Sequence, residues 1–127
     1  SIPDELGGWW CFVRTSKAQA GDGAKIITAL GALAHEIGVP RWTVVVGPDA
    51  DAFRFDSALF HWCANTAPER DRYLSKCGRR VAFDATPKRP GDERNGAPVR
   101  EWPPIICMDG GTIGAVSARW REFGLPG

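Results

Sequence analysis

The sequence has no apolar run approaching the length needed to cross a bilayer, which for a helix is about 20 residues. It also has no excess of either charge, because 16 Lys and Arg against 15 Asp and Glu leave a formal net charge of +1. A near-neutral chain carries no bulk electrostatic indication of binding to nucleic acid or to an anionic membrane. We therefore expect neither nucleic acid nor a membrane among its partners.

None of the four cysteines, Cys11, Cys63, Cys77 and Cys107, forms a CxxC pair. No cysteine or histidine has finger-like spacing, so a structural zinc site is not expected. Three of the four lie in apolar segments, where a free thiol behaves as a small hydrophobe. These features predict a reduced, cytoplasmic protein without disulfides. The pattern of a signal peptide is missing too, and because the first residue is Ser1, we expect a chain processed, tagged or cut from something longer.

What the sequence does contain is globular in character. Of its 127 residues 43% are apolar and 24% charged, which is the composition of one ordinary folded domain. Residues 9–14 are aromatic and β-rich and predict a first strand. A helix starting at Asp22 or Gly23 follows, with apolar side chains at helical spacing as far as Ile37. Residues 42–46 are mostly apolar with almost no alternation, which is typical of a strand covered on both faces. Strand, helix and strand in this order predict a right-handed crossover unit.

The second half continues with a helix over residues 57–65 capped by Asp56, a turn at 67–71, a short strand at Tyr73 and Leu74, and a strand at 80–84. Residues 87–104 contain five prolines and predict a long loop, and residues 112–123 predict a terminal helix. The expected fold class is α/β: a single domain with a mixed β-sheet flanked by helices, a long Pro-rich loop and a C-terminal helix.

Two aspartates, Asp49 and Asp51, directly follow the second strand. Carboxylates at a strand end can hold a hard cation, and they can equally cap the backbone amides of a tight turn. No third carboxylate has suitable spacing, so we favour the turn and expect no metal site. His61 has no orienting carboxylate or nucleophile in its pattern, which favours a packed or interface histidine over a catalytic base. We expect no catalytic residue in the chain.

Residues 21–25, Gly-Asp-Gly-Ala-Lys, precede the first helix and hint at an anion held by a helix N-terminus. The full phosphate-loop pattern is absent, so this signal is weak. The chain also has six tryptophans. Trp102 in the loop, and Trp120 and Phe123 on the terminal helix, are suited to anchor an interface, because aromatic side chains dominate such contacts.

Several segments together resemble a known family. The strand at 43–46 runs into Gly47-Pro48-Asp49-Ala50-Asp51, Trp62 lies in the second helix, Pro68-Glu69-Arg70-Asp71 follows it, and Phe83-Asp84-Ala85-Thr86-Pro87-Lys88 closes the stretch. In this order they resemble the C-terminal domain of the UbiD-type decarboxylases, over roughly residues 9–124. The family pattern commonly has an apolar residue where this chain has His61, and often an aspartate where it has Gly47.

The resemblance implies membership of a family of reversible, non-oxidative decarboxylases of aromatic or α,β-unsaturated acids. The family uses prenylated FMN, with a divalent metal (Mn or Mg) and K⁺ at its phosphate, and a Glu-Arg-Glu set acts on the substrate. None of those residues maps onto this chain, because they belong to the upstream flavin-binding domain. By the same resemblance residues 1–127 are one C-terminal domain, which binds no cofactor alone, is inactive alone, and has that upstream domain and further copies of itself as partners.

The resemblance also implies roles for particular segments. The domain mediates oligomerisation and forms one wall of the substrate cleft, and Asp84, Ala85 and Thr86 are the candidates for that wall. A plain strand end is the other interpretation of these three residues. Asp71 is expected to fix the turn after the second helix by accepting bonds from backbone or Arg. A second function class stays open: a standalone α/β ligand-binding module or small enzyme with a pocket near Asp49, Asp51 and His61.

Overall fold

The computed structural model describes residues 1–33, 38–100 and 108–124. Its centre is a four-stranded mixed sheet in the order β1-β2-β4-β3. β1 (Trp10–Arg14), β2 (Trp42–Val46) and β4 (Val81–Ala85) run parallel, and β3 (Arg72–Leu74) pairs antiparallel with β4. The expected α/β fold with a mixed sheet is therefore confirmed.

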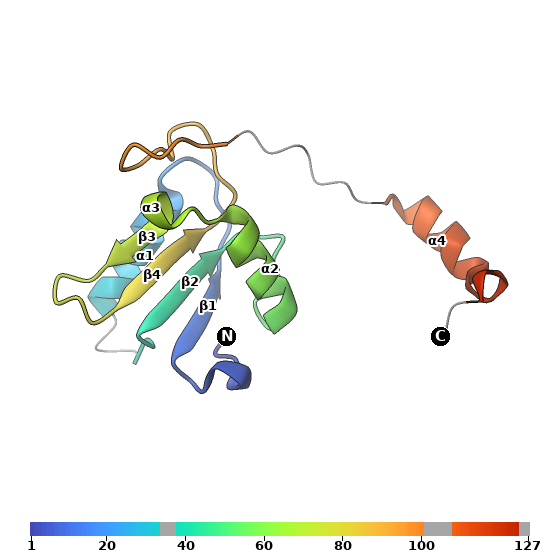
Figure 1. Cartoon of the computed structure of the whole chain (residues 1–127), viewed down its shortest axis with the longest axis horizontal. Coiled ribbons are helices and arrows are strands. Elements are labelled where there is room, and N and C mark those ends of the chain that lie inside the picture. Colours follow the sequence, from blue (N-terminus) through green and yellow to red (C-terminus); the bar gives the residue numbers. More distant parts are fainter. Residues whose placement is uncertain (34–37, 101–107, 125–127) are drawn as a thin grey trace.

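Helices cover the two faces of this sheet (Figure 1). α1 (Asp22–Leu33) joins β1 to the parallel strand β2, which is the predicted crossover, and it packs against β2 and β4. α2 (Phe55–Asn65) covers the opposite face of the same two strands. β2 is mostly apolar because both of its faces are covered, and residues 43–46 are all buried.

The core lies between the sheet and α2. It is built from Phe12, Val44, Val46, Ala58 and Ala85 among its buried members, with Trp10, Phe55, Trp62 and Phe83 packed against them. Trp10 stacks on Trp42 with ring centroids 4.9 Å apart, and Trp62 contacts Trp10 from α2 at 4.8 Å. Aromatic pairs of this kind add to what burial alone contributes.

Several boundaries differ from the sequence expectation. α2 begins at Phe55 rather than after Asp56, and the Asp56 side chain is not its N-cap, because the N-cap residue is Arg54. The expected turn at 67–71 is a one-turn helix, α3 (Pro68–Asp71), with proline at its start. A short 3₁₀ helix, η1 (Asp4–Leu6), precedes β1 and was not predicted. The predicted end of the first helix at Ile37 lies outside the described residues.

The predicted terminal helix is two elements, α4 (Gly110–Ala118) and the 3₁₀ helix η2 (Trp120–Phe123). Asp109 caps α4 by accepting a hydrogen bond from the Thr112 amide at 2.9 Å. The two elements lie apart from the sheet in Figure 1, and every residue from 108 to 124 except Val116 is exposed. No helix of the described segments is long and apolar enough to cross a membrane.

Candidate functional site: a buried ionic cluster at the carboxyl edge of the sheet

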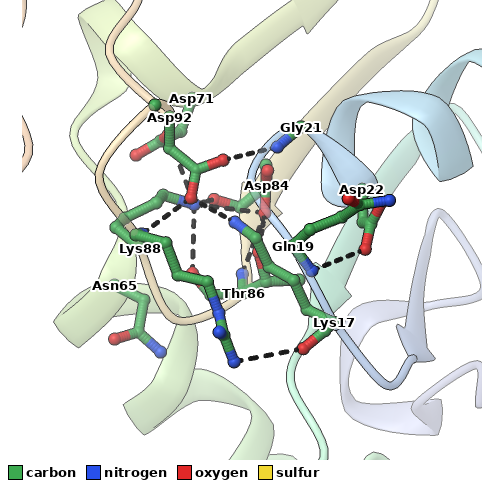
Figure 2. Close-up of polar contacts among 12 residues, drawn as sticks. Lys17, Gln19, Gly21, Asp22, Asn65, Asp71, Asp84, Thr86, Lys88 and Asp92 are labelled. Atoms are coloured by element: carbon green, nitrogen blue, oxygen red, sulfur yellow. Dashed lines mark hydrogen bonds and ion pairs between the residues drawn. The ribbon is translucent and has the colours of Figure 1, made fainter.

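The carboxyl ends of the three parallel strands meet at one edge of the sheet, where α/β proteins commonly bind ligands. In this chain that edge holds a cluster of buried charged side chains, the ionic cluster, shown in part in Figure 2. Its members come from the segment after β1, from α3, from the end of β4 and from the proline-rich loop: Lys17, Arg70, Asp71, Asp84, Lys88 and Asp92.

The first pair joins residues 75 positions apart. Lys17 Nζ lies 2.5 Å from Asp92 Oδ2, and the two side chains are only 2% and 5% exposed. Asp92 also accepts hydrogen bonds from the backbone N–H of Gly21 at 2.8 Å and of Arg89 at 2.7 Å. Burial alone raises the pKa of Asp92, but the hydrogen bonds from Lys17, Gly21 and Arg89 outweigh it and lower that pKa. Asp92 is therefore held as a carboxylate.

The second group lies at the end of β4. Asp84 Oδ1 accepts hydrogen bonds from the Thr86 amide at 3.0 Å and from its hydroxyl at 2.5 Å. Lys88 Nζ lies 3.1 Å from Asp84 Oδ1 and 3.3 Å from Asp71 Oδ1, so one buried ammonium serves two carboxylates. Lys88 also donates to the backbone carbonyls of Asp84 and Thr86. The polar groups at the end of β4 are therefore bonded to one another.

The third group fixes α3, as expected for Asp71. Its carboxylate accepts a hydrogen bond from the Ala67 amide at 2.7 Å and two from the guanidinium of Arg70, at 2.8 and 2.9 Å. The hydrogen bond to the Asp71 carboxylate is the main reason that the pKa of Arg70 is raised above its ordinary value. Arg70 donates its remaining bond to the carbonyl of Pro98 at 2.7 Å. Arg70 is buried and therefore faces the interior of the domain.

The proline-rich loop is fastened along the same edge. Arg94 donates to the carbonyls of Arg70 and Arg72 and lies over the ring of Tyr73, 4.0 Å from its centroid. Asn95 Nδ2 donates to the carbonyl of Glu69 at 2.9 Å. Described residues of this loop, 87–100, are irregular as predicted, and these bonds keep them over α3 and the end of β4.

The ionic cluster contains three cations and three carboxylates, each paired within the chain. A flavin phosphate needs cations or N–H groups that are free to meet it, and here Lys17, Lys88 and the Gly21 amide are already engaged by aspartates. In the described part of the chain no three His, Cys, Asp or Glu side chains lie together as a metal site requires. Among the described residues, the ionic cluster thus does not fit the phosphate of prenylated FMN or its divalent metal.

The three predicted cleft-wall residues lie inside this cluster or beside it. Asp84, Ala85 and Thr86 are all buried, with Ala85 packed in the core and its carbonyl accepting a hydrogen bond from Asn65 at 3.2 Å. Their side chains make no surface of this chain, and a role in a cleft wall stays a prediction. Enlarging Ala85 would test core packing, because any larger side chain there overpacks the sheet against α2.

The groove found in the described part of the chain does not include the other sequence candidates. This groove of about 610 Å³, the hairpin groove, lies between α1 and the β3–β4 hairpin, and Asp49, Asp51 and His61 do not line it. His61 is half-buried on α2 and makes an edge contact with the ring of Phe60 at 5.4 Å. Among the interface candidates Trp120 and Phe123 are exposed, and Trp102 lies outside the described residues.

Asp51 has the geometry of a turn residue. Its Oδ1 accepts a hydrogen bond from the Phe53 amide at 2.9 Å, while Asp49 is exposed without a hydrogen bond to the described residues. We expect Asp51→Ala to lower stability by about 1 kcal/mol, as for other lost caps, and Asp49→Ala to leave it within about 0.5 kcal/mol. Thermal or urea unfolding measures both variants. Equal losses, or a stoichiometric metal released by Asp51→Ala, would contradict the turn interpretation.

The sequence did not indicate Lys17 or Asp92. For residues 21–25 it suggested an anion at the helix start, and in the structure that anion is a side chain of the same protein, because the Gly21 amide donates to the Asp92 carboxylate. Gly23 faces Asp84 so closely that a Cβ there would overlap the carboxylate. Only a joint variation of the glycines at this helix start with the distant aspartates could have revealed these contacts. A single sequence contains no such information.

Comparison with known proteins agrees with this architecture. Residues 1–97 match the model of the UbiD_C family, described as the 3-octaprenyl-4-hydroxybenzoate carboxy-lyase C-terminal domain. An uncharacterized protein of Aeropyrum pernix is 26% identical over 129 residues, which is 90% of this chain and 26% of that protein. The chain thus spans about a quarter of the length of the relative it matches.

Solved structures show the same fold. The closed form of the vanillic acid decarboxylase of Sedimentibacter hydroxybenzoicus has a TM-score of 0.68 at 15% identity, covering 94% of this chain and 27% of that one. An open form of that enzyme has a TM-score of 0.63 at 14% identity, covering 93% and 27%. The fold and the family match together identify residues 1–97 as the C-terminal domain type of the carboxy-lyases. The chain belongs to the UbiD family of decarboxylases.

Proposed function

We propose that residues 1–127 are the C-terminal domain or small subunit of a reversible, non-oxidative decarboxylase of aromatic or α,β-unsaturated acids. The match to a C-terminal family model over 97 of 127 residues supports this assignment most directly. In this proposal the cofactor, prenylated FMN with Mn or Mg and K⁺, is bound by the upstream domain of the same cytoplasmic enzyme. When bound, the flavin supplies the electrophilic or dipolar partner for the substrate.

The domain's own contribution is assembly and shape rather than proton transfer. Its buried cations and carboxylates neutralise one another, so none is available as an acid, base or phosphate ligand without breaking an internal pair. The ionic cluster instead holds the proline-rich loop against the end of β4. The Asp84-Ala85-Thr86 segment would then shape the cleft wall by positioning that loop, and the exposed Trp120 and Phe123 would contribute to contacts between copies.

A substitution at His61 tests where the chemistry lies. In the full-length enzyme His61→Ala should change stability or assembly and leave the single-turnover rate of decarboxylation largely intact, because this histidine contacts an aromatic ring and no carboxylate among the described residues. Stopped-flow measurement of the flavin spectrum gives that rate. Loss of decarboxylation with normal flavin content and oligomeric state would place the chemistry in this domain.

The isolated chain provides the matched control. Titrated with prenylated FMN, it should show no binding, since Lys17 and Lys88 of the ionic cluster are already paired with aspartates. Saturable binding by the chain alone would favour the second function class, a standalone ligand-binding module or small enzyme.

A further inference from the structure

The hairpin groove lies on the face of the sheet that α1 covers, away from α2. α1 packs against β2 and β4, and the groove is the space between this helix and the β3–β4 hairpin. Its volume of about 610 Å³ is that of a small-molecule pocket, for which about 300–1,000 Å³ is usual. Residues of the ionic cluster do not line it. The groove is therefore a second concave site, separate from the carboxyl edge of the sheet.

The wall of the groove is mainly aliphatic. Tyr73 is the one aromatic residue among the described residues that line it, and Leu74 on the hairpin is 59% exposed. On α1, Gly31 contributes no side chain. Apart from its chain neighbours and the backbone of its own helix, no described residue has an atom within 4 Å of a Cβ built there. This wall suits a flexible aliphatic chain, and its aliphatic members are Ile27, Leu30, Ala32, Val39, Leu74, Val81 and Ala82.

One end of the groove is basic. The hairpin turn supplies the basic rim, defined as Lys76, Arg79 and Arg80, of which Lys76 and Arg80 line the groove. No Asp or Glu is among the described residues that line it. Arg80 donates to the carbonyl of Val39, whereas Lys76 and Arg79 are exposed and form no ion pair with another described residue. These two cations attract an anion to this end of the groove.

We propose that the hairpin groove binds an aliphatic carboxylate, with its chain between α1 and the hairpin and its carboxylate at the basic rim. An aliphatic wall with a cationic end matches an apolar chain with an anionic end. The volume suits such a ligand better than a protein surface, because a stable protein contact covers about 800 Å² on each partner. The inference goes beyond the proposed function, since it gives this domain a ligand site of its own.

Cys77 lines the groove beside the basic rim and can report its occupancy. This thiol is exposed, and its hydrogen bond with the Ser75 hydroxyl is the main reason that its pKa is lowered. It should therefore react readily with a maleimide. With Cys63 and Cys107 changed to Ser, octanoate should slow the labelling of Cys77 several-fold and saturably. Octanol, which has the same chain without the charge, should need about tenfold more, the effect of 1.4 kcal/mol.

Two substitutions test the two ends of the groove by calorimetric titration with octanoate. Gly31→Leu places a side chain in the open space of the groove and should abolish binding, whereas Gly31→Ala adds one methyl group and should still bind. Lys76→Glu should weaken binding about tenfold, the effect of 1.4 kcal/mol. Arg121→Glu, on the exposed η2, is the matched charge control and should change nothing.

The same measurements can overturn the proposal. Equal binding of octanoate and octanol, or binding that survives both Gly31→Leu and Lys76→Glu, would show that the groove does not select an aliphatic carboxylate. Labelling of Cys77 in the full-length enzyme tests the other occupant, a further part of the protein. If octanoate protects Cys77 in this chain but not in the full-length enzyme, the groove is covered there by protein and the proposal is wrong.

Discussion

Replacing Lys17 by methionine is expected to destabilise the fold by about 3–5 kcal/mol, the cost of removing one partner from a buried ion pair. The loss is large because Asp92, 5% exposed, would stay buried without its cation. Urea unfolding measures the difference. Lys25→Met is the matched control, since Lys25 pairs with Asp22 at 3.1 Å but is 68% exposed, and an exposed pair contributes at most about 1 kcal/mol.

The same pair predicts a pH dependence. The pKa of Asp92 is lower in the folded protein than in the unfolded chain, so its stabilising effect is present above the ordinary aspartate pKa of about 3.9 and is lost as the pH falls through the folded value. Lys17→Met should reduce this loss of stability in acid. Equal unfolding free energies for the Lys17 and Lys25 variants, or an unchanged acid limb, would show that the buried pair does not hold the loop.

The second large effect is expected at Gly23. An alanine Cβ at this position would overlap the carboxylate of Asp84, which is itself held by Lys88 and Thr86. We expect Gly23→Ala to cost about 3 kcal/mol, from overpacking together with a disturbed buried carboxylate.

Gly31 in the same helix provides the control. Apart from its chain neighbours and the backbone of its own helix, no described residue has an atom within 4 Å of a Cβ built there, so Gly31→Ala should stabilise the protein by about 0.5–1 kcal/mol through helix propensity. Thermal unfolding of the two variants should therefore shift in opposite directions. A stabilising Gly23→Ala would mean that α1 does not approach the end of β4 as closely as the structure has it.

Many features of the fold follow from patterns local in the sequence. The apolar run of β2 and the helical spacing of α1 are set by neighbouring residues, and they locate the strand and the start of the helix to within a residue or two. The run from Phe83 to Lys88 and the Pro68–Asp71 turn, read together, indicated the family, and the match over residues 1–97 confirmed it. The role of Asp71 in fixing its turn was predictable because its partners, Ala67 and Arg70, lie within four positions.

The ionic cluster was decided only by the tertiary structure. Lys17 and Asp92 are 75 positions apart, and nothing in the residues next to either one distinguishes a buried charge from an exposed one. The same holds for Asp84, which at a strand end could face a cleft and instead faces Lys88, Thr86 and Gly23. Burial of a charge depends on which distant segment supplies the opposite charge, whereas strand and helix periodicity depends on neighbours. The sequence alone therefore determined the elements and the family, and the packing of α1, α3 and the loop on the sheet decided which charges became buried.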